Sequence, residues 1–437
     1  MKRDLSLSGL TMFRGGIAPQ LVEVRSWLDP AYEVQVLEAA TDEHWHVRLR
    51  HPVHGAADVR CPREQTNSAQ DLIHFDPRLT DREKSVLSDG KSHVEVRLPP
   101  GGSDLLVDRK RFLRFMAAVG GDVAVGAHDI LASCWWTPDS LAEELSHDAP
   151  VDISALFTIH AIYDGPADES RETYWLHTHG LREAGFTDYD VLAPHPEVHG
   201  RSFDVLRALA FSIVEEQLVP DGDPSTIVRP GGDMRLVPAK TVLDNAGSQF
   251  KQWRDGVDDF HLVGHSVVCD PGIKRSFFGL GPARATPSTF LSNDIPDGVL
   301  IMFSNSASVL MAYRAQATYN YLRRLKEEFG ELAPGILVKL GYPAEGGADH
   351  DREHIWFEVN GLKETTVDAT CINTPFNVPG LQKGQRGEHP IELLSDWMMF
   401  TPFGSINPRF QYAARAIRAD PEEARRQMDE RRAGQPG

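Results

Sequence analysis

Cysteine is scarce in this sequence, and the few cysteines present lie far apart. The 437 residues contain four, at Cys61, Cys134, Cys269 and Cys371, and no two form a CxxC pair. Small secreted domains depend on closely spaced cysteines for their disulfides, and many structural zinc sites depend on paired cysteines. Neither feature is expected here, and isolated thiols are typical of a reducing, cytoplasmic environment.

Long apolar runs are missing as well. The longest, Val299–Phe303, has the length of a strand, whereas a membrane-spanning helix needs about 20 consecutive apolar residues. At the N-terminus, Lys2 and Arg3 are not followed by the apolar stretch of a signal peptide. We therefore expect a cytoplasmic protein without a membrane partner.

Positive charge is outweighed by negative charge. The chain has 45 Lys and Arg residues against 63 Asp and Glu residues, which gives a net charge of -18. This charge repels phosphate backbones at long range, so nucleic acid is not expected as a partner. One dense basic run (Arg109, Lys110, Arg111 and Arg114) falls on an amphipathic helical pattern, and we interpret it as a solvated helix face.

Intact catalytic and nucleotide-binding motifs are absent. The sequence has no HExxH, no EF-hand loop and no Walker lysine, and the GxG at Gly279 and Gly281 lacks its third glycine. Gly264 and Ser266 begin a hydrolase elbow, but Val268 stands where GxSxG requires its second glycine. No cofactor is expected on these grounds, and a non-enzymatic role is favoured.

Apolar and charged residues occur in ordinary globular proportions, 41% and 25%. A chain of this length exceeds what one core usually organises, so several domains are expected. Strand-like alternation at Trp45, Val47 and Leu49 and a helical stripe from Met311 to Phe329 predict mixed structure. We expect an α+β, multidomain fold with a small C-terminal module that combines a helix with an antiparallel sheet. The expected parts are an α+β domain over 1–150, a second α+β region over 151–300, a β-rich module over 308–415 and an exposed charged tail over 416–437.

Two segments resemble bacterial families of unknown function. The motifs AQATYNYLRRL, ILVKL, HIWFEVNGL and DATCINTPFNVPGLQKGQRGEHPIELLSDWMMF follow in this order between Met311 and Phe400, and together they resemble domain of unknown function 2314. Further upstream, LFTIHAIYD and TYWLHTHGLREAGFTDYDVL are similar to family 4026, also of unknown function. The resemblance implies a bacterial protein with a shared architecture, but neither family name implies a reaction or a ligand.

Histidines gather in the middle of the sequence. His177 and His179 form an HxH pair on a predicted strand, with His160 on the preceding strand and His195 shortly after. Residues two apart share one face of a strand, so the pair can present two imidazoles to one Zn²⁺ ion. The alternative is a polar strand face on which the histidines are solvated or hydrogen-bonded to the backbone. His160, His177, His179 and His195 are therefore candidate ligands of a zinc ion.

Aromatic and methionine side chains are unusually frequent near the C-terminus. Trp356, Met398 and Phe403 are candidates for a partner-binding patch, because exposed aromatic residues near methionine often form one. The alternative is that these side chains pack against a helix or another domain.

Two functional hypotheses follow. The first is a non-catalytic cytoplasmic protein that binds or regulates a protein partner, for example an immunity or inhibitor-like protein whose acidity directs it to a basic target. The second is a metal-dependent hydrolase or metal-binding protein that uses the histidines around His177 and His179.

Overall fold

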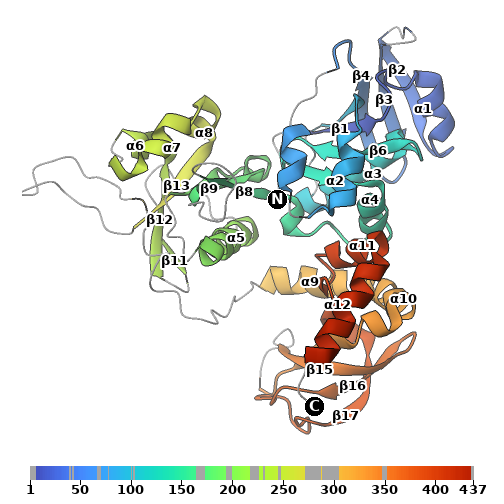
Figure 1. Ribbon diagram of the computed structural model, residues 1–437, viewed down its shortest axis with the longest axis vertical. Coiled ribbons are helices and arrows are strands. Elements are labelled where there is room, and N and C mark those ends of the chain that lie inside the picture. Colours follow the sequence, from blue (N-terminus) through green and yellow to red (C-terminus); the bar gives the residue numbers. More distant parts are fainter. Residues whose placement is uncertain are drawn as a thin grey trace, which may run out of the picture. The chain divides into compact units, whose positions relative to one another are not determined.

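The protein has an α+β, multidomain fold, as the sequence predicts. The computed structural model describes residues 6–38, 41, 44–65, 70–76, 78–99, 101, 104–163, 173–192, 199–216, 226–229, 232–244, 248–270, 287, 305–346 and 352–434. The chain divides into two compact units. One comprises 1–65, 93–136 and 153–304, and the other comprises 66–92, 137–152 and 305–437 (Figure 1). Among the described helices, none has the length and apolarity needed to cross a membrane.

The first sheet has the strand order β2-β3-β4-β5-β1-β6-β7. Its strands are β1 (Leu7–Phe13), β2 (Glu33–Glu38), β3 (Trp45–His51), β4 (Gly55–Cys61), β5 (Ser92–Leu98), β6 (Ala124–Asp129) and β7 (Cys134–Trp136), accompanied by α1 (Leu21–Trp27) and α3 (Leu105–Gly120). Helix α3 packs on β1 at Gly9, where a Cβ atom would come within 2.7 Å of Phe112 and 2.6 Å of Met116. Gly9 therefore allows the helix to approach the strand closely.

The basic run on α3 is only partly a solvated face: the interpretation of the sequence was wrong for Arg109 and Lys110, whereas Arg111 and Arg114 are partly exposed. Arg109 and Lys110 are 0% and 5% exposed. Arg109 forms ion pairs with Asp129 on β6 and with Glu183, whose side chains are also buried. The two acidic partners stabilise the buried cation. They are distant from Arg109 in sequence, so the helical pattern of the basic run cannot predict these ion pairs.

The second sheet has the order β11-β12-β13-β10-β9-β8. Its strands are β8 (Thr158–Tyr163), β9 (Thr173–His179), β10 (Asp188–Leu192), β11 (Thr226–Arg229), β12 (Gly232–Pro238) and β13 (His265–Cys269). Strands β10 and β13 are parallel, and the other neighbours are antiparallel. Strands β8 and β9 form the expected hairpin.

Helices lie on both sides of this sheet (Figure 1). They are α5 (His199–Glu216) on one side and α6 (Ala239–Leu243), α7 (Lys251–Gly256) and α8 (Asp259–Gly264) on the other. Val242 and Trp253 from this second group bury Trp175 and Val267 of the sheet. The apolar residues of Phe260–Cys269 predict a single strand, and this prediction is wrong. Its first half is helix α8, because the Asp258 side chain caps the helix by accepting a hydrogen bond from the His261 backbone N–H (3.0 Å).

The third sheet belongs to the C-terminal module, which we define as residues 305–434. Its order is β17-β16-β15-β14-β18-β19, with every neighbouring pair antiparallel. The module contains α9 (Asn305–Ala317), α10 (Tyr319–Phe329), β14 (Gly335–Pro343), β15 (Arg352–Leu362), β16 (Thr366–Cys371), β17 (Arg386–Pro390), β18 (Leu394–Thr401), β19 (Gly404–Ile406), α11 (Tyr412–Ala419) and α12 (Pro421–Gly434).

The helical stripe from Met311 to Phe329 is broken into α9 and α10 at Thr318. The Thr318 hydroxyl donates to the backbone oxygen of Arg314 (2.7 Å) and accepts from the Trp397 indole N–H (2.9 Å). Thr318, Arg314 and Trp397 are all buried in the interior of the module. Ile417, Ala424 and Met428 of the last two helices are buried as well.

Two short segments from earlier in the chain complete this unit. They carry α2 (Asp81–Ser88) and α4 (Pro138–Leu145), and Thr137 caps the start of α4. Ion pairs hold them to the C-terminal module: Arg415 contacts Glu83 (2.6 Å) and Glu143 (3.0 Å), and Arg314 contacts Glu144 (3.0 Å).

Candidate metal centre

Five histidines converge on one face of the second sheet. They are His160 on β8, His177 and His179 on β9, His261 on α8 and His265 at the start of β13, and we call them the histidine cluster. In the strand register His160 is the direct neighbour of His177, and His179 lies two residues further along the same face. Helix α8 brings His261 over this face, so the cluster combines a hairpin with a segment about 80 residues later in the chain.

The imidazoles are close enough to bind a common ion. Ligand nitrogens of His160, His177 and His179 lie within 4.8 Å of one another, and so do those of His179, His261 and His265. The Nε2 atoms of His177 and His179 are 3.0 Å apart. His179 therefore belongs to both groups.

Four of the rings lie close together. For His177, His179, His261 and His265 the six ring-centre separations are 4.7, 5.3, 6.0, 5.5, 5.7 and 4.8 Å. In a tetrahedral zinc site each nitrogen lies about 2.0 to 2.1 Å from the metal, which places imidazole centres about 5.2 Å apart. The observed separations scatter around this value, but the ligand nitrogens form two groups of three, and only His179 belongs to both.

The turn after β9 fixes the positions of the HxH pair. Asp188 accepts hydrogen bonds from the Thr178 hydroxyl (2.9 Å) and from the backbone N–H groups of Leu181 (3.2 Å) and Gly180 (3.3 Å). Gly180 has φ of 122°, and a Cβ atom there would lie 2.1 Å from the Leu156 carbonyl oxygen. Only glycine is compatible with this geometry, so the turn that follows the HxH pair requires Gly180.

Carboxylates contact the outer nitrogens of two of the rings. Asp190, on β10, accepts from the Trp175 indole N–H (3.0 Å) and lies 2.9 Å from Nδ1 of His265. Asp258 lies 2.6 Å from Nδ1 of His261. A carboxylate at Nδ1 favours the tautomer in which Nδ1 carries the proton, which leaves the Nε2 lone pair for a metal.

The environment keeps the central imidazoles neutral. Burial lowers the pKa of His177 well below its ordinary value, and the neighbouring His179 lowers it further. Burial, with repulsion from His160, lowers the pKa of His179 to about 2. Neutral imidazole is the form that coordinates metal ions.

Three of the four histidines singled out in the sequence, His160, His177 and His179, are brought together, and His195 lies outside the described residues. His261 and His265 were missed. The spacing HLVGH is the sequence signal for them, but the apolar residues of this segment favour a strand and give no indication that it approaches the hairpin.

The candidate partner-binding residues do not form one patch. Trp356 and Met398 lie half-buried on the outer face of the third sheet, where the Lys339 ammonium is 5.4 Å from the Trp356 ring centre. Phe403 instead packs against the core of the C-terminal module.

Comparison with known proteins confirms the two family resemblances. Residues 159–256 match the C-terminal part of a protein of unknown function, DUF4026, and residues 308–431 match DUF2314, an uncharacterized protein conserved in bacteria. No curated protein and no solved structure matches the chain. The first match contains His160, His177 and His179 and ends before His261.

Proposed function

We propose that this protein binds a transition-metal ion, preferably Zn²⁺, in the histidine cluster. The observation that carries the proposal is the presence of two overlapping groups of three imidazoles, in each of which the ligand nitrogens lie within 4.8 Å of one another. The groups are His160, His177 and His179, and His179, His261 and His265. An all-imidazole donor set suits zinc, copper and nickel better than magnesium or calcium, which prefer oxygen ligands.

The energetics of the cluster support a bound ion. Packing five imidazoles together removes them from water, and neutral rings that lack enough partners pay a desolvation cost. The Nδ1 atom of His177 is a buried nitrogen without a hydrogen-bond partner among the described residues. A metal ion bound by one of the two groups of imidazoles would convert several lone pairs into coordinate bonds and offset that cost.

The number of imidazoles that bind the ion bears on its role. Catalytic zinc sites keep one position for water, whereas four protein ligands close a tetrahedral shell. Each group in the histidine cluster supplies three imidazoles, so the fourth position of a tetrahedral shell is left for a further ligand. The ion would join the β8–β9 hairpin to α8 and β13.

This proposal replaces the protein-binding hypothesis as the preferred one. The histidine cluster is a located site with matched geometry, whereas Phe403 is separated from Trp356 and Met398 by its packing in the core.

The test is elemental mass spectrometry of the purified full-length protein after dialysis against zinc. We expect about one equivalent of zinc per chain, lost in the double variant His177→Ala/His265→Ala. The control is His46→Ala, because His46 lies on β3 and contacts Glu38 rather than the cluster. Circular dichroism verifies that the variants fold. Less than a tenth of an equivalent in the unaltered protein, or equal zinc in the double variant, would refute the proposal.

A further inference from the structure

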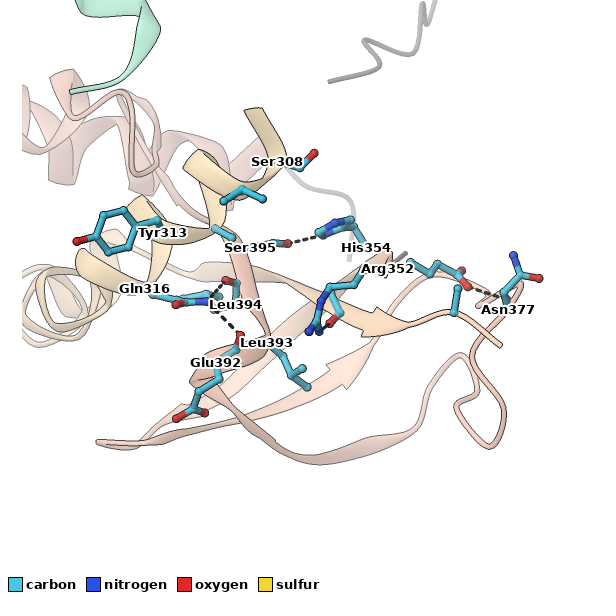
Figure 2. A pocket seen from close by; sticks show the side chains of 15 residues that line it. Ser308, Tyr313, Gln316, Arg352, His354, Asn377, Glu392, Leu393, Leu394 and Ser395 are labelled. Atoms are coloured by element: carbon cyan, nitrogen blue, oxygen red, sulfur yellow. Dashed lines mark hydrogen bonds between the residues drawn. The ribbon is translucent and has the colours of Figure 1, made fainter. Parts of the chain in front are cut away.

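A second candidate site lies in the C-terminal module, in the unit that does not contain the histidine cluster. A hollow of about 930 Å³ opens between helix α9 and the ends of strands β14, β15 and β18 (Figure 2). Its volume falls near the upper end of the range of about 300 to 1,000 Å³ that is usual for small-molecule sites. Its lining mixes apolar side chains with a few polar groups.

The hydrogen bonds of Ser395 determine what His354 offers to this hollow. The Ser395 hydroxyl oxygen lies 3.1 Å from the Lys339 carbonyl oxygen and 2.8 Å from Nδ1 of His354. A carbonyl can only accept, so the single hydroxyl hydrogen is donated to Lys339. His354 must then donate from Nδ1 to Ser395, which leaves its Nε2 as a hydrogen-bond acceptor.

His354 keeps this acceptor at neutral pH. Burial lowers the pKa of His354, and the nearby charges of Lys339 and Arg352 lower it further. The ring is therefore neutral, and a ligand that contacts Nε2 has to supply an N–H or O–H group.

Arg352 supplies a cation beside this acceptor. Its Nη1 donates to the Gly341 carbonyl oxygen (2.8 Å), and no described carboxylate forms an ion pair with it. The adjacent Glu353 is already engaged, because its oxygens accept from the backbone N–H groups of Phe376 (2.8 Å) and Asn377 (2.6 Å). The Glu392 carboxylate points away from Arg352 (Figure 2). The remaining guanidinium N–H groups can bind a carboxylate in a two-pronged geometry.

Apolar side chains complete the hollow on the side of the helix. Val309 and Ala312 of α9 and Leu393, just before β18, line it. A ligand that satisfies Arg352 and His354 can place an apolar group against these residues.

We propose that this hollow binds the C-terminal end of a peptide with an apolar last residue. The terminal carboxylate contacts Arg352, the last backbone N–H donates to Nε2 of His354, and the apolar side chain packs on Val309, Ala312 and Leu393. A free apolar amino acid has the same carboxylate and an N–H donor, but the volume of about 930 Å³ favours the longer ligand.

The test is fluorescence anisotropy with the full-length protein and the peptide Gly-Gly-Ala-Leu labelled at its N-terminus. The probe with a free carboxylate should bind, and its C-terminal amide should bind at least about ten-fold more weakly, since a charge-assisted contact is lost. Methylation of the last backbone nitrogen should also weaken binding several-fold, because His354 then loses its donor.

The matching protein variant is Arg352→Gln, which should reproduce the loss seen with the amide probe. The control is Arg386→Gln, an exposed arginine on β17 of the same sheet that pairs with Asp368. No binding at millimolar peptide, equal affinity for acid and amide, or an equal loss in both variants would overturn the proposal. Free leucine and the unlabelled peptide are compared as competitors of the probe. If leucine displaces the probe at the same concentration as the peptide does, the proposal of a peptide ligand is refuted in favour of a free amino acid. Zinc removal should leave all these affinities unchanged, so the result is independent of the metal centre.

Discussion

Removal of one ligand from the histidine cluster should abolish the stabilisation that zinc provides. In His265→Ala the group that His265 forms with His179 and His261 keeps only two imidazoles, and Asp190 loses one of its two partners. The variant is also expected to be less stable without metal, since a buried side chain is truncated. The informative quantity is therefore the change in melting temperature on addition of zinc, compared between the variant and the unaltered protein.

The magnitude follows from mass action. An ion that binds only the folded state stabilises it by about 2.7 kcal/mol when its free concentration is 100 times the dissociation constant. For a unit of roughly 150 to 250 residues this corresponds to about 5 to 10 °C in melting temperature. We expect that increase for the unaltered protein and for His46→Ala, and a near-zero change for His265→Ala.

The assay is differential scanning fluorimetry of protein stripped with a chelator, with and without zinc. Stripping is confirmed by elemental analysis before each scan. The reasoning is refuted if zinc leaves the unaltered protein's melting temperature unchanged, or if His265→Ala gains as much as the control variant.

Three further predictions concern other parts of the structure. Asp190→Asn removes the charge at Nδ1 of His265 and should weaken zinc binding about 10- to 100-fold by competition titration, while equal affinity would exclude a positioning role. In the unaltered protein the buried Trp397 indole N–H donates to the Thr318 hydroxyl (2.9 Å), and Thr318→Val removes this acceptor. Urea unfolding should show that the variant's free energy of unfolding is about 1 to 3 kcal/mol lower. Burial lowers the pKa of His389 in the folded chain, so the unfolded chain takes up a proton first. Stability should therefore be full above pH of about 6.5 and fall as the pH drops toward the folded pKa, with a shallower decline in His389→Gln by urea unfolding at several pH values.

The sequence predicted the hairpin that carries three of the five histidines, because β8 and β9 are short, apolar and separated by polar residues. It did not predict α8. The run from Phe260 to Cys269 is rich in apolar residues, and its helical half depends on one cap from Asp258. Sequence periodicity is weak over six residues, so a single side-chain hydrogen bond decides the outcome.

The interpretation of Arg109 failed for a different reason. Its helical pattern is genuine, but Asp129 and Glu183 come from other parts of the fold and neutralise the charge in the interior. The break at Thr318 is similar, since Trp397 on β18 supplies the decisive contact. Convergence of His261 and His265 with the hairpin likewise depends on tertiary structure, which the spacing of residues within one segment does not encode.

The alternation along β9 gives the histidine cluster a role in selecting the correct strand pairing. His177 and His179 point to one face, and Leu176 and Thr178 point to the other. A shift of β9 by one residue against β8 would move both imidazoles away from α8 and expose no second pair of ligands in their place. A metal ion that requires His179 together with His261 and His265 would therefore bind only the chain with the native register. Its binding energy would favour that register over shifted pairings with similar backbone hydrogen bonds.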